Sequence, residues 1–158
     1  MKSKKFRLRL LLATIYRKIK ILKLNLSGYN FHFSIIIERG VKLDKLNKRG
    51  IFIGKNTLIA SGTTILSHDH CKRDINDNPL FIDTKIGSNC FIAVNATILP
   101  GVEIGNQCIV GAGSVVTKNI PSNSVAVGNP AKIIRNNIRM NDFAALENWN
   151  EKLGGWID

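Results

Sequence analysis

The sequence repeats every six residues between Ile86 and Ile120. An aliphatic residue opens each unit, and the fifth position is small or modest in size in five of the six units. The aliphatic openings are Ile86, Ile92, Ile98, Ile104, Val110 and Val116. A helix repeats every 3.6 residues and a strand every two, so a period of six indicates a β-helix. With one unit per face and three per turn, the aliphatic side chains stack inside a prism whose coils lie about 4.8 Å apart.

The repeat also predicts the environment of two cysteines. Cys90 and Cys108 are eighteen residues apart, which is one full turn, so they should stack facing inward as small apolar residues. Cys71 lies in a polar segment and leaves an odd total. The sequence has no disulfide framework and no Cys-x-x-Cys metal site. This cysteine usage favours a reducing, cytoplasmic compartment.

Length and charge place further bounds on the chain. Its 158 residues suit one domain, and the thin interior of a three-sided prism favours oligomerisation to cover its faces. The formal net charge is +12, yet nine Lys and Arg residues fall within residues 2–23, which contain no acid. The remainder has fourteen basic and eleven acidic residues, which argues against a nucleic-acid-binding surface.

Residues 1–27 are expected to form a basic amphipathic helix. Apolar residues at helical spacing are Leu8, Leu11, Leu12, Ile15, Ile19 and Leu22. The apolar run 10–16 is too short to span a bilayer, and a signal-peptide cleavage site is missing. Two interpretations stay open: the helix docks on its own domain, or it lies on an anionic membrane surface, with the protein peripheral on the inner face.

The repeat domain is expected over residues 28–135, with irregular first coils up to Gly50. The spacing from Ile65 to Ile86 is twenty-one residues, which is not a multiple of six. A loop at 71–85 must therefore project from the prism, and loops on a rigid scaffold often carry function.

A C-terminal tail follows the repeat domain at residues 136–158. It includes a short amphipathic helix predicted over 141–153, which begins at Asn141 or Asp142 and ends before two glycines.

Two of the three histidines stand at the edge of this loop. His68 and His70 flank Asp69, and imidazole is the natural base near neutral pH. Neither a serine-nucleophile motif nor a phosphate loop is present. A zinc site would need His68, His70 and a third ligand such as His32 or a residue of another subunit. The spaced histidines of the γ-class carbonic anhydrases are missing, so no metal is expected.

The stretch IGSNCFIAVNATILPGVEIGNQCIVGAGSVVTKNIP, followed by VAVGNPAKIIR, resembles the hexapeptide-repeat acyltransferases. The resemblance covers roughly Ile53–Arg135 and is greatest to O-acetyltransferases acting on maltose, galactosides, Nod factors and surface-polysaccharide sugars. It implies an all-β, left-handed parallel β-helix, an exception to the right-handed crossover rule. It also implies a homotrimer that binds acetyl-CoA between subunits and acetylates a sugar hydroxyl in polysaccharide biosynthesis.

The resemblance carries over to individual positions. It places the catalytic base on His70, with His68 as the second choice. Residues matched to coenzyme contacts are Val94, Ala112, Thr117, Lys118, Lys132 and Arg135, of which the last two would meet phosphates. Small residues at 111–113 would let the pantetheine arm lie close to the coil.

The chain also departs from this family. Phe91 replaces the usual Trp, Ala93-Val94 replaces a Gly-small pair, and the N-terminal sugar-contacting domain of the maltose and galactoside enzymes is not recognisable. The acceptor and the size of the acyl group therefore stay open. Alternatives are an N-acetyltransferase on an amino-sugar, a serine O-acetyltransferase, whose long helical N-terminal domain is absent, and a non-catalytic scaffold.

Overall fold

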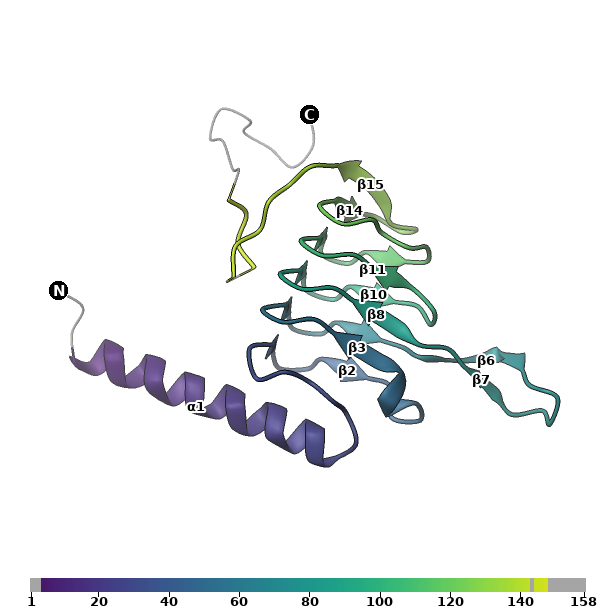
Figure 1. Cartoon of the computed structure of the whole chain (residues 1–158), viewed down its shortest axis with the longest axis horizontal. Helices are drawn as coiled ribbons and strands as arrows, with labels where there is room; N and C mark the ends of the chain where they lie inside the picture. Colours follow the sequence, from purple (N-terminus) through teal and green to yellow (C-terminus); the bar gives the residue numbers. More distant parts are fainter. Residues whose placement is uncertain (1–3, 143, 148–158) are drawn as a thin grey trace.

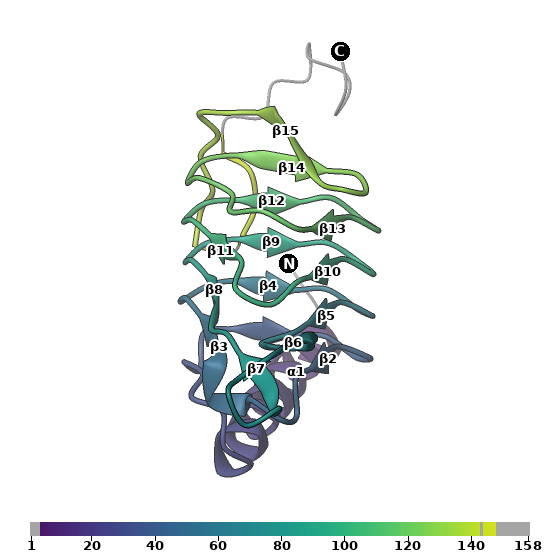
Figure 2. The same ribbon diagram turned by 90° about the vertical axis from the view of Figure 1, so that its right-hand side faces the viewer.

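Each six-residue unit forms one short strand and one turn, and successive units occupy the three faces of a prism (Figure 2). The computed structural model describes residues 4–142 and 144–147. The first face consists of β1 (Ile36–Ile37), β4 (Leu58–Ile59), β9 (Phe91–Ile92), β12 (Ile109–Val110), β14 (Val125–Val127) and β15 (Lys132–Arg135). The second face consists of β2 (Lys42–Leu43), β5 (Thr64–Ile65), β10 (Thr97–Ile98) and β13 (Val115–Val116). The third face consists of β3 (Ile51–Ile53), β8 (Thr84–Ile86) and β11 (Glu103–Ile104).

Strand pairing confirms the coil length predicted from the repeat. Ile92 pairs in parallel with Val110, eighteen residues on, whereas Ile59 pairs with Ile92, thirty-three residues on. The longer coil contains the predicted projecting loop, which is an antiparallel hairpin of β6 (His68–Arg73) and β7 (Pro79–Phe81). Figure 1 shows this hairpin leaving the side of the stack. The hairpin begins at His68, so both candidate histidines belong to it.

The prism interior is filled by the columns that the repeat predicts. The fully buried aliphatic residues include Ile59, Ile92, Val110, Ile65, Ile98 and Val116. Cys90 and Cys108 stack as expected: both are buried, both are free thiols, and the backbone N–H of Cys108 lies 3.4 Å from the Cys90 sulfur. The hydrogen-bonded neighbour Cys108 and, second, burial raise the pKa of the Cys90 thiol, which suits a core residue.

The turns before the first face use residues that tolerate a left-handed backbone. Asn56, Asn89, Gln107 and Asn123 all have φ between 56° and 63°, two residues before a strand of that face. Asparagine adopts this region more readily than most residues. Close coil contact adds a second constraint at Gly87, where a Cβ atom would lie 2.5 Å from the carbonyl oxygen of Gly105. These turns fix the three-sided shape.

The N-terminal helix α1 (Lys4–Leu26) is present as predicted and lies at the first-coil end of the stack (Figure 1). A short 3₁₀ helix, Lys48–Gly50, leads into β3. No helix in the described part of the chain is long and apolar enough to cross a membrane.

The predicted C-terminal helix over 141–153 is wrong for the residues that are described there. Residues 141, 142 and 144–147 form a turn, with an isolated bridge between Met140 and Leu146. Ala144 and Leu146, which lie within the predicted range, belong to or pack against an apolar cluster on the outer side of the first face, and this packing replaces a helix. Residues 148–153 lie outside the described residues.

Candidate active site

A buried carboxylate lies at the root of the hairpin. Asp44 directly follows β2 and is 4 % exposed. Its side chain accepts backbone N–H bonds from Leu46 at 2.9 Å, Asn47 at 3.3 Å and Ser67 at 2.8 Å. A carboxylate taken out of water needs such donors. Asp44 is therefore held in one orientation by the backbone of two successive coils.

The same carboxylate positions His68, the first residue of β6. Asp44 Oδ2 forms a hydrogen bond with His68 Nδ1, and the histidine side chain is 14 % exposed. An ionised carboxylate can only accept, so Nδ1 carries the proton in this pair. The other ring nitrogen, Nε2, is then the basic one, as in histidines oriented by a carboxylate for proton transfer.

His70 lies against His68 but is held differently. The two rings meet edge to face, with centroids 4.6 Å apart and an angle of 87° between their planes. His70 is exposed, and no hydrogen bond to its ring is found within the described ranges. Among the described residues no group of three His, Cys, Asp or Glu side chains is placed to hold a metal ion. His32 bonds to Ser34 instead, with Nδ1 2.8 Å from its Oγ.

Two opposing effects set the pKa of Asp44. Burial acts to raise this pKa, but the bonds from the backbone and from His68 outweigh it, so the pKa lies below its ordinary value. A folded-state pKa below the unfolded one contributes stability above the unfolded value, about 3.9, and loses it as the pH falls through the folded value. The ionised form of Asp44 thus stabilises the fold at neutral pH.

This dependence gives a prediction for Asp44→Asn. We expect the variant to unfold more easily at pH 7 by about 1.5–3 kcal/mol, because bonds to a charged acceptor are weakened. The difference from the wild type should shrink below about pH 4, where Asp44 protonates in the unfolded chain. Urea denaturation across pH checks this, with Asp77→Asn as control, since the Asp77 side chain is 91 % exposed. A difference that stays constant with pH would contradict the assigned role of the charge.

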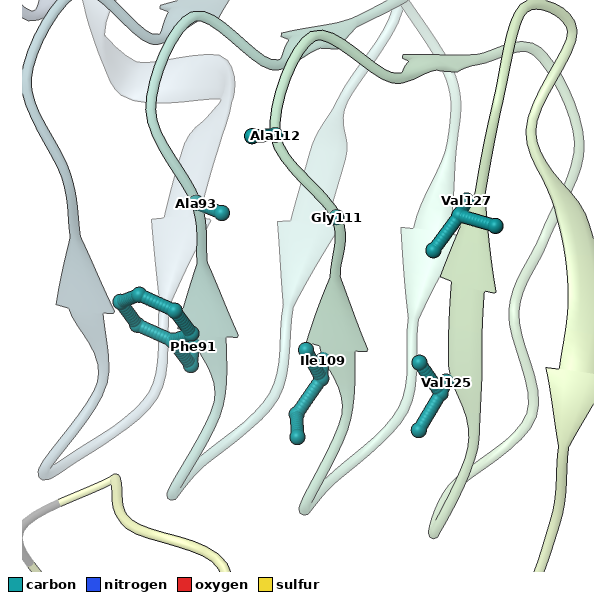
Figure 3. A pocket seen from close by; sticks show the side chains of 7 residues that line it. All are labelled: Phe91, Ala93, Ile109, Gly111, Ala112, Val125 and Val127. Atoms are coloured by element: carbon teal, nitrogen blue, oxygen red, sulfur yellow. The ribbon is translucent and has the colours of Figure 1, made fainter. Parts of the chain in front are cut away.

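An apolar groove lies on the outside of the first face (Figure 3). It has a volume of about 340 Å³ and is lined by three neighbouring strands and the turn after the middle one. The lining residues are Phe91, Ala93, Ile109, Gly111, Ala112, Val125 and Val127. A Cβ atom on Gly111 would lie 2.6 Å from Val127 Cγ1, so a larger residue there would fill the groove. The groove could receive a slender, largely apolar chain.

Four predicted coenzyme contacts occupy two different corners of the prism. Val94 and Ala112 stack at the corner between the first and second faces, where the N–H of Gly113 donates to the Val94 carbonyl oxygen. Thr117 and Lys118 follow β13 at the next corner. His68 follows the same corner two coils earlier in the chain. Ile65, Ile98 and Val116 are in register on the second face, so the coil of Ile98 separates His68 from Thr117 and Lys118.

The two residues predicted to contact the coenzyme phosphates lie beside the groove. Lys132 and Arg135 begin and end β15, which pairs with β14. In this pairing Lys132 lies opposite Val127, and Arg135 lies opposite Val125. Both valines line the groove, so the two cations stand beside it. One chain does not bring the groove and the histidines together, since the second face separates them.

Sequence reasoning missed Asp44. It lies twenty-four residues before His68 and belongs to no motif. The only available signal is weak: Asp44 is the sole acidic residue between Glu38 and Asp69 in a basic segment.

Comparison with known proteins identifies the repeat. Residues 83–118 match the family model described as bacterial transferase hexapeptide (six repeats). The solved structure of the polysialic-acid-specific acetyltransferase NeuO is 32 % identical, with a TM-score of 0.53, and the match covers 65 % of this chain and 52 % of NeuO. Residues 83–118 are therefore similar to the hexapeptide-repeat transferases. The chain spans about half the length of NeuO, and no curated protein matches it.

Two further acetyltransferase structures share the fold at lower identity. A maltose O-acetyltransferase from Clostridium difficile 630 is 24 % identical with a TM-score of 0.53, over 78 % of this chain and 88 % of that one. A galactoside acetyltransferase in complex with coenzyme A is 24 % identical with a TM-score of 0.52, over 78 % and 82 %. The likeness of the fold to these structures, together with the hexapeptide match at residues 83–118, indicates a left-handed β-helix.

Proposed function

We propose that this hexapeptide-repeat protein moves an acetyl group from acetyl-CoA to a hydroxyl group of a sugar, with His68 as general base. The observation that carries the proposal is the Asp44–His68 pair at the root of the hairpin. The likeness to NeuO, described as a polysialic-acid-specific acetyltransferase, supports a glycan acceptor and a role in surface polysaccharide biosynthesis.

His68 is preferred to His70 as the general base because its bond to Asp44 already fixes the ring proton on Nδ1. With Nδ1 bonded to Asp44, Nε2 can take the proton of the acceptor hydroxyl as that oxygen attacks the acetyl carbon. The carbon–sulfur bond of the thioester then breaks, and the proton passes from His68 to the departing sulfur. Asp44 stabilises the imidazolium that exists between these two transfers. His70 packs against the base and limits its movement.

The groove on the first face suits the coenzyme. Its walls are apolar and its floor carries Gly111, which fits the narrow pantetheine arm. Lys132 and Arg135 stand beside it and would meet the phosphates by charge-assisted bonds. Because the second face separates this groove from His68 of the same chain, the base that serves it belongs to a neighbouring subunit of a homotrimer.

The acceptor is proposed to bind beside the hairpin. A hollow there is lined by Leu46, Asp74, Asn78, Leu80 and Phe81. Phe81 is paired with His68 across the hairpin and is 58 % exposed, so its ring is free to contact a substrate. A sugar ring offers apolar C–H faces as well as hydroxyls, and this mixture of an aromatic ring and polar groups suits it.

Calorimetric titration with acetyl-CoA tests the coenzyme site. We expect the wild type to bind, and Lys132→Ala/Arg135→Ala to bind at least about tenfold more weakly, because each lost charge-assisted bond contributes about 1.5–3 kcal/mol. Lys42→Ala/Lys55→Ala removes the same charge from exposed positions away from the groove and should bind like the wild type.

Absence of binding by the folded wild type would overturn the proposal in favour of a non-catalytic scaffold. Equal weakening in both double variants would mean that the effect comes from total charge and not from the groove. If binding holds, product analysis with sugar and amino-sugar acceptors distinguishes an ester from an amide.

A further inference from the structure

Helix α1 docks on the prism by one side only. Ile21 is 1 % exposed and belongs to the core, and Leu24 packs against that core. The Lys20 ammonium on the same side donates to the carbonyl oxygens of Ile37 at 2.8 Å and Glu38 at 2.6 Å. These contacts fix the rotation of the helix about its own axis.

The opposite side of α1 is an exposed apolar stripe. Its residues are Leu8, Leu11, Leu12, Ile15, Ile19, Leu22 and Leu26, each 45–80 % exposed. On a projection of about 100° per residue they fall within a sector roughly 100° wide, centred opposite the docked side. A continuous apolar patch of this length is unusual on a protein surface and marks a contact site.

Cations border the stripe on both sides. On the same projection Lys18 lies along one edge, and Lys23 and Arg9 lie along the other. Residues 2–23 contain nine Lys and Arg and no acid. An apolar face between rows of cations is the arrangement of helices that lie in the interface of anionic bilayers. The apolar residues enter the acyl boundary while the cations meet lipid phosphates.

We propose that the stripe of α1 binds the surface of an anionic lipid bilayer and holds the protein there as a peripheral protein. Charge favours a bilayer over a second copy of the chain. Two copies of this helix would bring together basic segments without acids, and the rest of the chain is also basic, with fourteen cationic and eleven anionic residues.

The position of α1 permits this contact. The helix lies at the first-coil end of the stack, and its N-terminal half extends beyond the coils (Figure 1). The stripe points away from the docked side, so a flat surface can reach it without meeting the prism. This inference does not depend on acetyl transfer, because no residue of α1 belongs to the proposed site.

Vesicle flotation tests the proposal on the full chain. Wild-type protein is mixed with vesicles of phosphatidylcholine alone or with phosphatidylglycerol as about a third of the lipid. We expect binding to the anionic vesicles only. Leu8→Gln/Leu12→Gln/Ile15→Gln, which keeps good helix formers, should lose this binding. Arg9→Gln/Lys18→Gln/Lys23→Gln should reduce it by about 100-fold, since each cation contributes about fivefold near an anionic surface.

A charge-matched control separates the helix from general basicity. Lys55→Gln/Lys72→Gln/Lys85→Gln removes the same charge from the coils and hairpin and should bind like the wild type. Circular dichroism shows whether each variant keeps its fold. Failure of the wild type to float with anionic vesicles overturns the proposal, and so does unchanged flotation of the folded stripe variant. If the wild type does not bind vesicles and the stripe variant changes the molecular mass measured by sedimentation, the stripe is instead a contact between subunits.

Discussion

Replacing His68 with alanine is expected to lower kcat for acetyl transfer by about 10²- to 10⁴-fold, the range contributed by a positioned general base. The reason is the bond to Asp44, which fixes the proton on Nδ1 and leaves Nε2 to accept the substrate proton. His70→Ala should cause a clearly smaller loss, because His70 touches the base only through a ring contact. Steady-state kinetics with a saturating sugar acceptor measures both.

Two controls make this comparison decisive. Acetyl-CoA binding by calorimetry should be unchanged in both histidine variants, since the groove and the cations beside it, Lys132 and Arg135, are kept. Asp44→Asn should lower kcat and also change the pH profile of kcat, which a purely structural residue would not do. A larger loss in His70→Ala than in His68→Ala would return the role of base to His70.

The six-residue phase made the coils predictable. A period of six fixes which residues point inward, so the buried columns and the stacking of Cys90 on Cys108 follow from spacing alone. The hairpin was predictable for the same reason, because the spacing from Ile65 to Ile86 breaks the phase. Periodic constraints of this kind are visible without any knowledge of distant contacts.

Contacts between coils that do not follow the six-residue repeat were not predictable from the sequence. Asp44 reaches His68 because an irregular first coil passes beneath the root of the hairpin, and no local pattern encodes that passage. The prediction of a C-terminal helix failed for a similar reason. The spacing of residues 141–153 suits a helix, yet Ala144 and Leu146 pack against the apolar cluster of Ile109 and Val125 on the first face. Tertiary packing of this kind overrides local preference.

The N-terminal helix shows an intermediate case. Spacing predicted α1, and the leucines and isoleucines of its stripe were recognised as one face. The side that docks could not be foreseen, because it uses Ile21 with the stem and ammonium of Lys20. Only the structure shows that the larger apolar face is the exposed one.

Replacing Ile98 with alanine is expected to lower the free energy of unfolding by about 2–5 kcal/mol, the cost of emptying a packed aliphatic site. Ile98 is completely buried and lies in register between Ile65 and Val116. Backbone bonds on both sides hold these coils at their spacing, so the walls cannot close on the cavity. Urea denaturation at one fixed protein concentration measures the change, since association would shift the apparent stability.

Ile75→Ala provides the matched control, because Ile75 is fully exposed at the hairpin and the same atoms are removed there. Its effect should stay within about 0.5 kcal/mol, as for other surface changes. A difference of less than about 1 kcal/mol between the two variants would contradict a tightly filled prism.

Close packing of the prism interior matters for the candidate active site as well. Leu66 N–H donates to the Ile98 carbonyl oxygen, so the same coil supports the strand that delivers Ser67 and His68 to Asp44. A softened interior at Ile98 should therefore lower kcat even though Ile98 lies outside the proposed site.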